Sequence, residues 1–207
     1  SFTYTVSDGI APAVTGTTAI TVNPINDAPV ADDSVITVNE ESTDTALGLT
    51  APTDVDTASL TITVTGLPSV GTVTLADGTV VTNGMTLTSA QLTGLLFDAP
   101  ADLAATTNTS FTYTVSDGIA PAVTGTTAIT VNPINDAPVA DDSVITVNEE
   151  STDTALGLTA PTDVDTASLT ITVTGLPSVG TVTLADGTVV TNGMTLTSAQ
   201  LTGLLFD

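Results

Sequence analysis

The sequence has 207 residues, with 23 aspartates and glutamates and no lysine, arginine, histidine or cysteine, which gives a formal net charge of −23. It lacks the cationic side chains that form salt bridges and bind nucleic acid, and it lacks the histidine, cysteine and lysine on which most nucleophilic and general-base catalysis depends. We therefore expect no enzyme activity and no nucleic-acid partner. No apolar run is as long as the roughly 18 residues of a membrane span, so we also expect no direct membrane insertion.

Nearly the whole sequence is a repeat. Residues 1–98 recur without a change as residues 110–207, 109 positions further on. A unit of about 100 residues can bury a core of its own, so each repeat is expected to fold independently. Residues 23–30, copied at 132–139, hold two prolines after a strand-like run, which marks a junction between repeats. We predict three parts: 1–25, the C-terminal part of one repeat; 26–134, a complete repeat with its N-terminal linker; and 135–207, the N-terminal part of the next.

Short stretches in which apolar residues alternate with threonine or serine fill most of the complete repeat, and this period of two predicts strands. In chain order they are residues 35–38, 60–65, 72–75, 111–116 and 128–131. Residues 76–79 and 83–84 have hairpin-turn chemistry, and residues 89–92 are expected to form one short helical turn. About seven strands in a repeat of this length predict an all-β fold of tandem Greek-key sandwiches.

The acidic residues cluster where a sandwich would bring loops to its two ends. The junction carries Asn26, Asp27, Asp32 and Asp33, and its copy carries Asn135, Asp136, Asp141 and Asp142. Asp54-Val55-Asp56, copied at Asp163 and Asp165, lies in a loop before a strand, and its spacing puts both carboxylates on one side of an extended chain. Carboxylates that repel one another in a chain without cations suggest a bound cation, and a donor set of oxygens alone suits Ca²⁺.

Other interpretations of these acids stay open. Asp77 and Asp117, taken alone, are ordinary turn formers, and Asp44 and Asp102 are typical of solvated surface acids. Asp32 and Asp33 either contribute to a cation site or are simply solvated.

Two phrases of the sequence resemble a known family. Residues 110–118, SFTYTVSDG, and residues 128–139, AITVNPINDAPV, are similar to the cadherin-like and immunoglobulin-like tandem repeats of giant bacterial RTX adhesins. The resemblance implies Ig-like or cadherin-like sandwiches joined end to end by short calcium-binding linkers. It also implies a structural spacer that is secreted by a type I pathway, stands on the bacterial cell surface, and projects a distal binding domain for adhesion or biofilm formation.

The resemblance also implies which residues hold calcium. The cadherin Asn-Asp junction motif matches Asn26-Asp27 and Asn135-Asp136, and the Asp-x-Asp motif matches the pairs at 54 and 56 and at 163 and 165. The lone Asp before the last hairpin matches Asp117, and by the repeat Asp8. The early acidic residue that serves the far junction is Glu40 or Glu41, repeated as Glu149 and Glu150.

The expected partners are the neighbouring identical repeats of the same chain, and no small-molecule substrate is expected. An alternative function is a glycan-binding or self-binding (homophilic) adhesive module. It has less support because sugar sites favour stacking aromatics, and most of the few aromatic residues here occupy core-like alternating positions.

Overall fold

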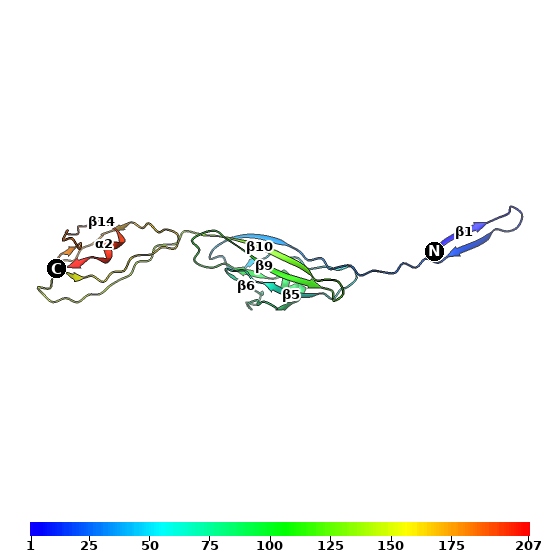
Figure 1. Ribbon diagram of the computed structural model, residues 1–207, viewed down its shortest axis with the longest axis horizontal. Coiled ribbons are helices and arrows are strands. Elements are labelled where there is room, and N and C mark those ends of the chain that lie inside the picture. The colour runs from blue at the N-terminus through cyan, green and yellow to red at the C-terminus, as the bar shows by residue number, and fades with distance from the viewer.

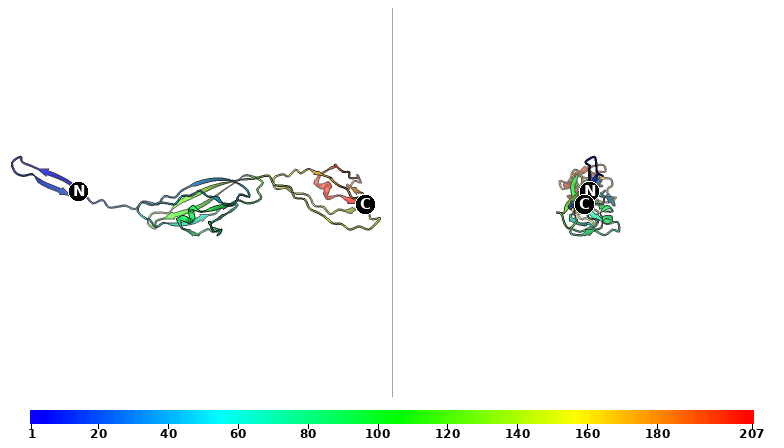
Figure 2. Two further views of the ribbon diagram at one scale, coloured as in Figure 1. Left: turned by 180° about the vertical axis from the view of Figure 1, so that it is seen from behind. Right: turned by 90° about the vertical axis from the view of Figure 1, so that its right-hand side faces the viewer.

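The computed structural model describes residues 1–207 and is long and narrow (Figures 1 and 2). A separate hairpin forms one end, a β-sandwich lies in the middle, and a smaller β unit forms the other end. We call these parts the N-terminal hairpin (residues 1–25), the central unit (26–134) and the C-terminal unit (135–207). The two helices have five residues each, and no helix could cross a membrane.

The central unit is a sandwich of two sheets. Its elements are β3 (Ser34–Asn39), β4 (Thr45–Ala46), β5 (Thr61–Gly66), β6 (Thr72–Thr74), β7 (Thr86–Leu87), α1 (Ser89–Thr93), β8 (Leu96–Asp98), β9 (Thr107–Ser116) and β10 (Val123–Asn132). One sheet has the order β3-β10-β9-β5-β7, and the other has the order β4-β8-β6. β3 runs parallel to β10, whereas the other pairs are antiparallel.

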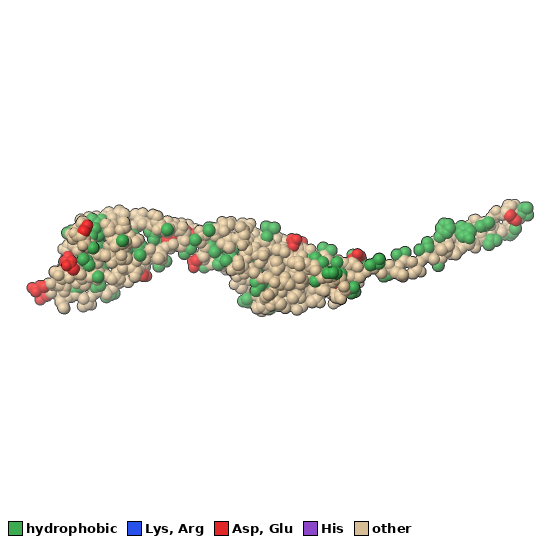
Figure 3. Space-filling view, viewed as in Figure 1, with side chains coloured by type: hydrophobic (Ala, Val, Ile, Leu, Met, Phe, Trp, Pro, Cys, Tyr) green, Lys and Arg blue, Asp and Glu red, His purple; other side chains and the backbone are tan.

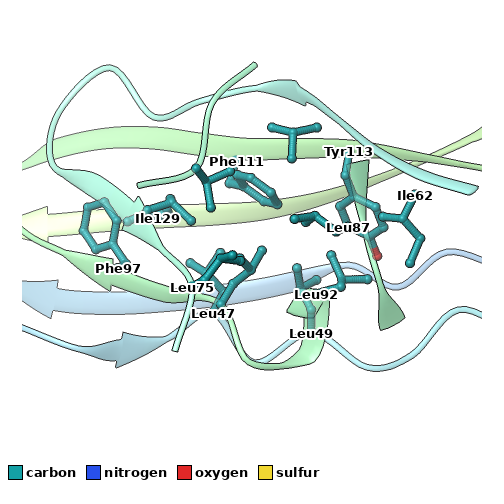
Figure 4. Packing of buried hydrophobic residues seen from close by; sticks show 14 of the residues in the cluster. Leu47, Leu49, Ile62, Leu75, Leu87, Leu92, Phe97, Phe111, Tyr113 and Ile129 are labelled. Atoms are coloured by element: carbon teal, nitrogen blue, oxygen red, sulfur yellow. The ribbon is translucent and has the colours of Figure 1, made fainter. Parts of the chain in front are cut away.

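The core of the central unit follows from the alternation of apolar residues with threonine. Along β9, Phe111, Tyr113 and Val115 are fully buried while the threonines between them face outward. They belong to a cluster of 17 buried hydrophobic residues from both sheets, among them Leu47 and Leu92 (Figure 4). The predicted all-β sandwich is therefore confirmed, and so is the helical turn, which is α1.

Tyr113 fastens the start of the central unit to its core. Its hydroxyl donates to the carbonyl oxygen of Asp32 at 2.8 Å and accepts from the Asp32 N–H at 3.1 Å. The ring lies against Gly125 on β10, where an added Cβ would come within 2.4 Å of the ring carbon Cζ. The segment after the junction is thus held by a hydrogen-bonded pair, and glycine is required beside it.

No strand of the two flanking parts is longer than five residues. The N-terminal hairpin consists of β1 (Phe2–Val6) and β2 (Val14–Thr18). The C-terminal unit contains β11 (Thr154–Ala155), β12 (Ile171–Thr172), β13 (Val182–Thr183), β14 (Thr195–Leu196), α2 (Ser198–Thr202) and β15 (Leu205–Phe206). Its buried core has five residues.

One predicted hairpin turn is wrong. Residues 76–79 close a turn between the bridged residues Thr74 and Val80, as expected. Residues 83–84 instead lead the chain from β6 in one sheet to β7 in the other. The Gly84 N–H donates to the carbonyl of Val64 at 2.8 Å, so contact with β5 directs the Asn-Gly turn across the sandwich.

Candidate metal centre

Most of the predicted ligands lie at the two ends of the central unit. We call the end formed by Asn26, Asp27, Asp54, Asp56 and Asp117 junction one. Junction two lies between the central and C-terminal units and is formed by Glu40, Glu41, Asp102, Asn135, Asp136, Asp163 and Asp165.

Hydrogen bonds hold junction one together across long sequence distances. The Asn26 side-chain amide Nδ2 donates to Asp117 Oδ2 at 2.8 Å, and the Asp27 N–H donates to Asp56 Oδ2 at 2.7 Å. The Asn26 amide, followed by the N–H groups of Ile119 and Ala120, lowers the pKa of Asp117. Asp117 therefore closes the turn after β9 and also contacts Asn26 at the junction.

The Asp-x-Asp loop leaves one carboxylate oxygen without a partner. Asp54 Oδ1 accepts the N–H groups of Asp56 at 2.8 Å and Thr57 at 2.6 Å, which fixes the loop. Asp54 Oδ2 is buried and has no hydrogen-bond partner. A buried charged oxygen with no partner is costly, so this atom stands where a cation would be stabilising.

Junction two repeats this pattern around Asp136. The Asp136 N–H donates to Asp165 Oδ2 at 2.6 Å, while Asp136 Oδ2 is buried without a partner. Burial raises the pKa of Asp136 above its ordinary value. Neighbouring negative charges raise it further, in the order Glu40, Asp165, Glu41 and Asp102. Glu40, Glu41 and Asp102 belong to the central unit, whereas Asp136 and Asp165 belong to the C-terminal unit, so their repulsion acts across the junction.

Glu40 is buried at this junction and is only 1% exposed. Its two carboxylate oxygens accept the backbone N–H groups of Leu103 and Ile134, both at 2.5 Å. Of the two glutamates predicted here, Glu40 thus binds the loop before β9 to the chain that leaves β10. Glu41 is exposed and has a positive φ of 62°.

Sequence reasoning missed Asp102, which was interpreted as a solvated acid. It lines one small hollow of about 230 Å³ together with Asp136 and Asp163. Asp102 belongs to no recognised motif. It also lies in residues 99–109, the one segment that has no copy in the chain. Only the topology, which brings the loop before β9 to the same end as the linker, reveals it.

Several predicted ligands lie in other surroundings. Asp32 Oδ2 accepts from the N–H of Thr50 at 2.9 Å and from its hydroxyl at 2.7 Å, and Asp33 Oδ1 accepts from the N–H of Thr126 at 2.7 Å. Asp8 accepts from its own turn, at Ile10 and Ala11. The hydroxyl of Thr159 donates to Asp141. None of these contacts involves another predicted ligand, and Asp142, Glu149 and Glu150 are exposed.

The residues fit calcium chemically, although their side chains do not yet form a closed site. Every candidate donor is an oxygen, and two buried carboxylate oxygens lack partners. As the side chains are placed, no group of three or more acids is close enough to hold a metal ion. Binding would therefore require carboxylates to turn inward at the junctions.

Comparison with known families decides what kind of domain carries these junctions. Residues 26–132 match the family model described as a bacterial Ig domain. The chain belongs to the bacterial Ig domain family. This confirms the Ig-like part of the resemblance. A bacterial Ig domain is typically a non-enzymatic structural unit and suggests an extracellular structural or adhesive role.

The solved structures that match this chain include two of protocadherins. The extracellular cadherin domains 1–5 of protocadherin gamma B2 match with 19% identity over 80% of this chain and 31% of that chain, with a TM-score of 0.39. The EC3–6 cis-dimer structure of protocadherin gammaB7 matches with 15% identity over 94% of this chain and 51% of that chain, with a TM-score of 0.36. The bacterial Ig chain thus spans about a third and about half of these two chains. No curated protein matches it.

Proposed function

We propose that this chain is part of the spacer, or extender, region of a long bacterial cell-surface adhesin of the RTX type. Identical Ig units follow one another along the chain, with divisions at residues 25/26 and 134/135, and calcium at the junctions holds them in line. The spacer would project a distal binding domain for adhesion or biofilm formation. The observation that carries this proposal is the set of acids from consecutive units around Asp136.

The electrostatics of junction two favour a cation there. Two carboxylates about 5 Å apart repel by about 3 kcal/mol at an effective dielectric of 20, and no lysine or arginine exists to offset this repulsion. Ca²⁺ accepts six to eight oxygen ligands. Asp136 from the linker and Asp163 and Asp165 from the C-terminal unit offer carboxylates to the same region as Asp102 of the central unit. Ligands shared between two units would fix their relative orientation.

The same electrostatics support folding outside the cell. At low intracellular calcium the charges of the junctions would oppose compact folding, whereas abundant extracellular calcium would promote it by mass action. Type I secretion and the bacterial surface fit this order of events.

Thermal unfolding with calcium and with chelator tests the proposal. Calcium at about 100 times its dissociation constant adds about 2.7 kcal/mol, which raises the unfolding midpoint of a domain of this size by about 10 °C. In Asp136→Asn most of this rise should disappear, while in chelator the variant should be at least as stable as the wild type because one repelling charge is gone.

Asp77→Asn is the matched control, because it removes the same charge from a turn outside the junctions. Its Oδ1 acceptor for the Thr79 N–H is kept in asparagine. The control should keep the full response to calcium. A wild-type midpoint that is equal in calcium and in chelator would overturn the proposal.

A further inference from the structure

Asn83 and Gly84 form an exposed tight turn in the central unit. The Met85 N–H donates to the carbonyl oxygen of Thr82 at 3.1 Å, and Gly84 has a positive φ of 84°, which a type II turn requires of its third residue. The side chain of Asn83 is exposed to water. The turn therefore presents a neutral asparagine directly before a glycine, and the junctions make no use of it.

An asparagine before a glycine can lose its side-chain amide. The backbone nitrogen of the glycine attacks the carbonyl carbon Cγ of the asparagine, a C–N bond forms, and the side-chain NH₂ group takes up the proton of the attacking N–H and leaves as ammonia. A molecule of water then opens the cyclic succinimide at either of its carbonyl carbons and gives aspartate or isoaspartate. Glycine favours the attack because it has no Cβ to hinder its nitrogen and restricts its backbone least.

The chain also contains four Asp-Gly pairs, and they are poorly suited to this reaction. The aspartates of these pairs are Asp8, Asp77, Asp117 and Asp186. Hydrogen bonds lower the pKa of each carboxyl, and the strongest contributors are, in the same order, Ala11, Thr79, Asn26 and Thr188. An ionised carboxylate is a poor target for a nucleophile. The chemistry therefore singles out the two Asn-Gly pairs, which begin at Asn83 and Asn192.

In the folded central unit the attacking nitrogen is already engaged. The Gly84 N–H donates to the carbonyl oxygen of Val64 at 2.8 Å, and the Val64 N–H donates to the carbonyl oxygen of Met85 at 2.9 Å. Val64 belongs to β5 and is only 1% exposed. Attack on Asn83 would require the Gly84 nitrogen to turn away from β5 and break these hydrogen bonds. The fold thus keeps the nitrogen from the reaction.

We infer that Asn83 is a modification site that reacts only while its unit is unfolded: the unfolded chain converts it to aspartate or isoaspartate, and the folded unit protects it. Asn192 is the same site in the C-terminal unit, where the Gly193 N–H donates to the carbonyl oxygen of Val173 at 2.8 Å. No predicted calcium ligand takes part in either contact, so the inference does not depend on the proposed function.

The two products differ in their effect on the fold. Aspartate keeps the backbone and adds a charge to a surface that shows acidic side chains and no basic ones (Figure 3). Isoaspartate routes the main chain through the side-chain methylene and so lengthens the turn. Residues 83–84 lead the chain from β6 to β7, where Leu87 is buried in the core (Figure 4). A longer turn would displace Gly84 from Val64 and Leu87 from the core, so a chain that stays unfolded would lose the ability to complete its sandwich.

Mass spectrometry of proteolytic fragments of the full chain tests the inference. Asn192→Gln removes the identical copy, so that all conversion in this stretch of sequence comes from Asn83. The chain is kept at neutral pH, folded in buffer with calcium or unfolded in urea. Conversion of Asn83 should be at least about 10-fold slower in the folded chain, because a hydrogen bond and the strand pairing beside it must open first. Equal rates under the two conditions would overturn the inference.

Asn108 is the control within the same chain. It is followed by Thr109, whose branched side chain hinders its own backbone nitrogen. Asn108 should therefore remain asparagine in urea over the time in which Asn83 is converted. Conversion of both at the same rate would show that the glycine has no part in the reaction. A calcium-independent unfolding midpoint would overturn the proposed function and leave these rates as they are.

Refolding separates the effects of the two products. Asn83→Asp supplies the charge without lengthening the backbone and should refold from urea as the wild type does. The Asn192→Gln chain, aged in urea and then refolded, should divide into a native fraction with asparagine or aspartate at position 83 and a less stable fraction enriched in isoaspartate. An even distribution of isoaspartate between the two fractions would contradict the effect on the fold.

Discussion

At the scale of single residues, Asp136 carries the most information about the junctions. Its carboxyl has a raised pKa because it is partly buried among other acids, whereas the N–H and hydroxyl of Thr79 lower the pKa of Asp77. Both residues are aspartates of the same chain and differ only in their surroundings. Their titrations therefore distinguish Asp136, which has a carboxylate oxygen without a hydrogen-bond partner, from Asp77, whose carboxylate accepts hydrogen bonds from Thr79.

We predict that in chelator Asp136 titrates above the ordinary aspartate pKa of 3.8 and Asp77 below it. A raised pKa means that the folded chain binds this proton more tightly than the unfolded chain. The contribution of Asp136 to stability is therefore greatest below the unfolded pKa and is lost as the pH rises through the folded pKa. Asp77 has the opposite sign, because its contribution is lost as the pH falls through its lowered pKa.

Carbon-detected NMR of the side-chain carboxyls measures both titrations. Addition of calcium should move the pKa of Asp136 downward and leave that of Asp77 unchanged, since a bound cation favours the ionised form. An Asp136 that titrates at or below 3.8 in chelator would refute the description of the junction.

How far the site could be predicted from sequence depends on the residue. The resemblance to the cadherin motifs implied that Asn26, Asp27, Asp56 and Asp117 hold calcium. The structure joins Asn26 to Asp117 and Asp27 to Asp56 by hydrogen bonds. Asp102 could not be found in this way, because its proximity to Asp136 depends on how the loop before β9 folds back. A linear pattern carries no information on such a meeting of distant segments.

At the scale of the elements, the hairpin β9–β10 and its copy β1–β2 show what tertiary packing adds to a local pattern. The alternation of apolar residues and threonine predicts strands in both copies, and both copies form them. Neither the parallel pairing of β3 with β10 nor the path of residues 83–84 across the sandwich could be predicted, because both depend on contacts between distant elements. The sandwich class follows from the pattern alone, but the order of its strands does not.

The two copies of the hairpin differ in burial, because Phe111 is fully buried whereas Phe2 is 59% exposed. We therefore predict unequal effects of one substitution made in two identical sequences. Phe111→Ala removes a fully buried ring from the central core and should lower the free energy of unfolding of this unit by about 3–5 kcal/mol. Phe2→Ala makes the same change in the exposed copy. It should leave the free energy of unfolding of the central unit within about 0.5 kcal/mol of the wild-type value.

Denaturant unfolding of both variants at low micromolar concentration measures these energies. A loss of similar size in the two variants would mean that the N-terminal hairpin is packed as its copy is, contrary to the structure.

At the scale of the whole molecule, the acids matter through where they lie. Repulsion spread evenly would only keep the chain soluble. Here, acids from consecutive units meet at a linker that contains prolines, which already limit its flexibility. A divalent ion held between the units would convert this repulsion into a fixed angle, and a row of identical units would then act as one stiff rod.

The most direct test of this claim is the spread of distances between neighbouring units. The chain has no cysteine, so Thr79→Cys and Thr188→Cys together provide one labelling site in the central unit and its copy in the C-terminal unit, both exposed. Single-molecule energy transfer between dyes at these sites should give one narrow distribution in millimolar calcium and a broad distribution in chelator. Equal distributions under both conditions would contradict a calcium-stiffened junction.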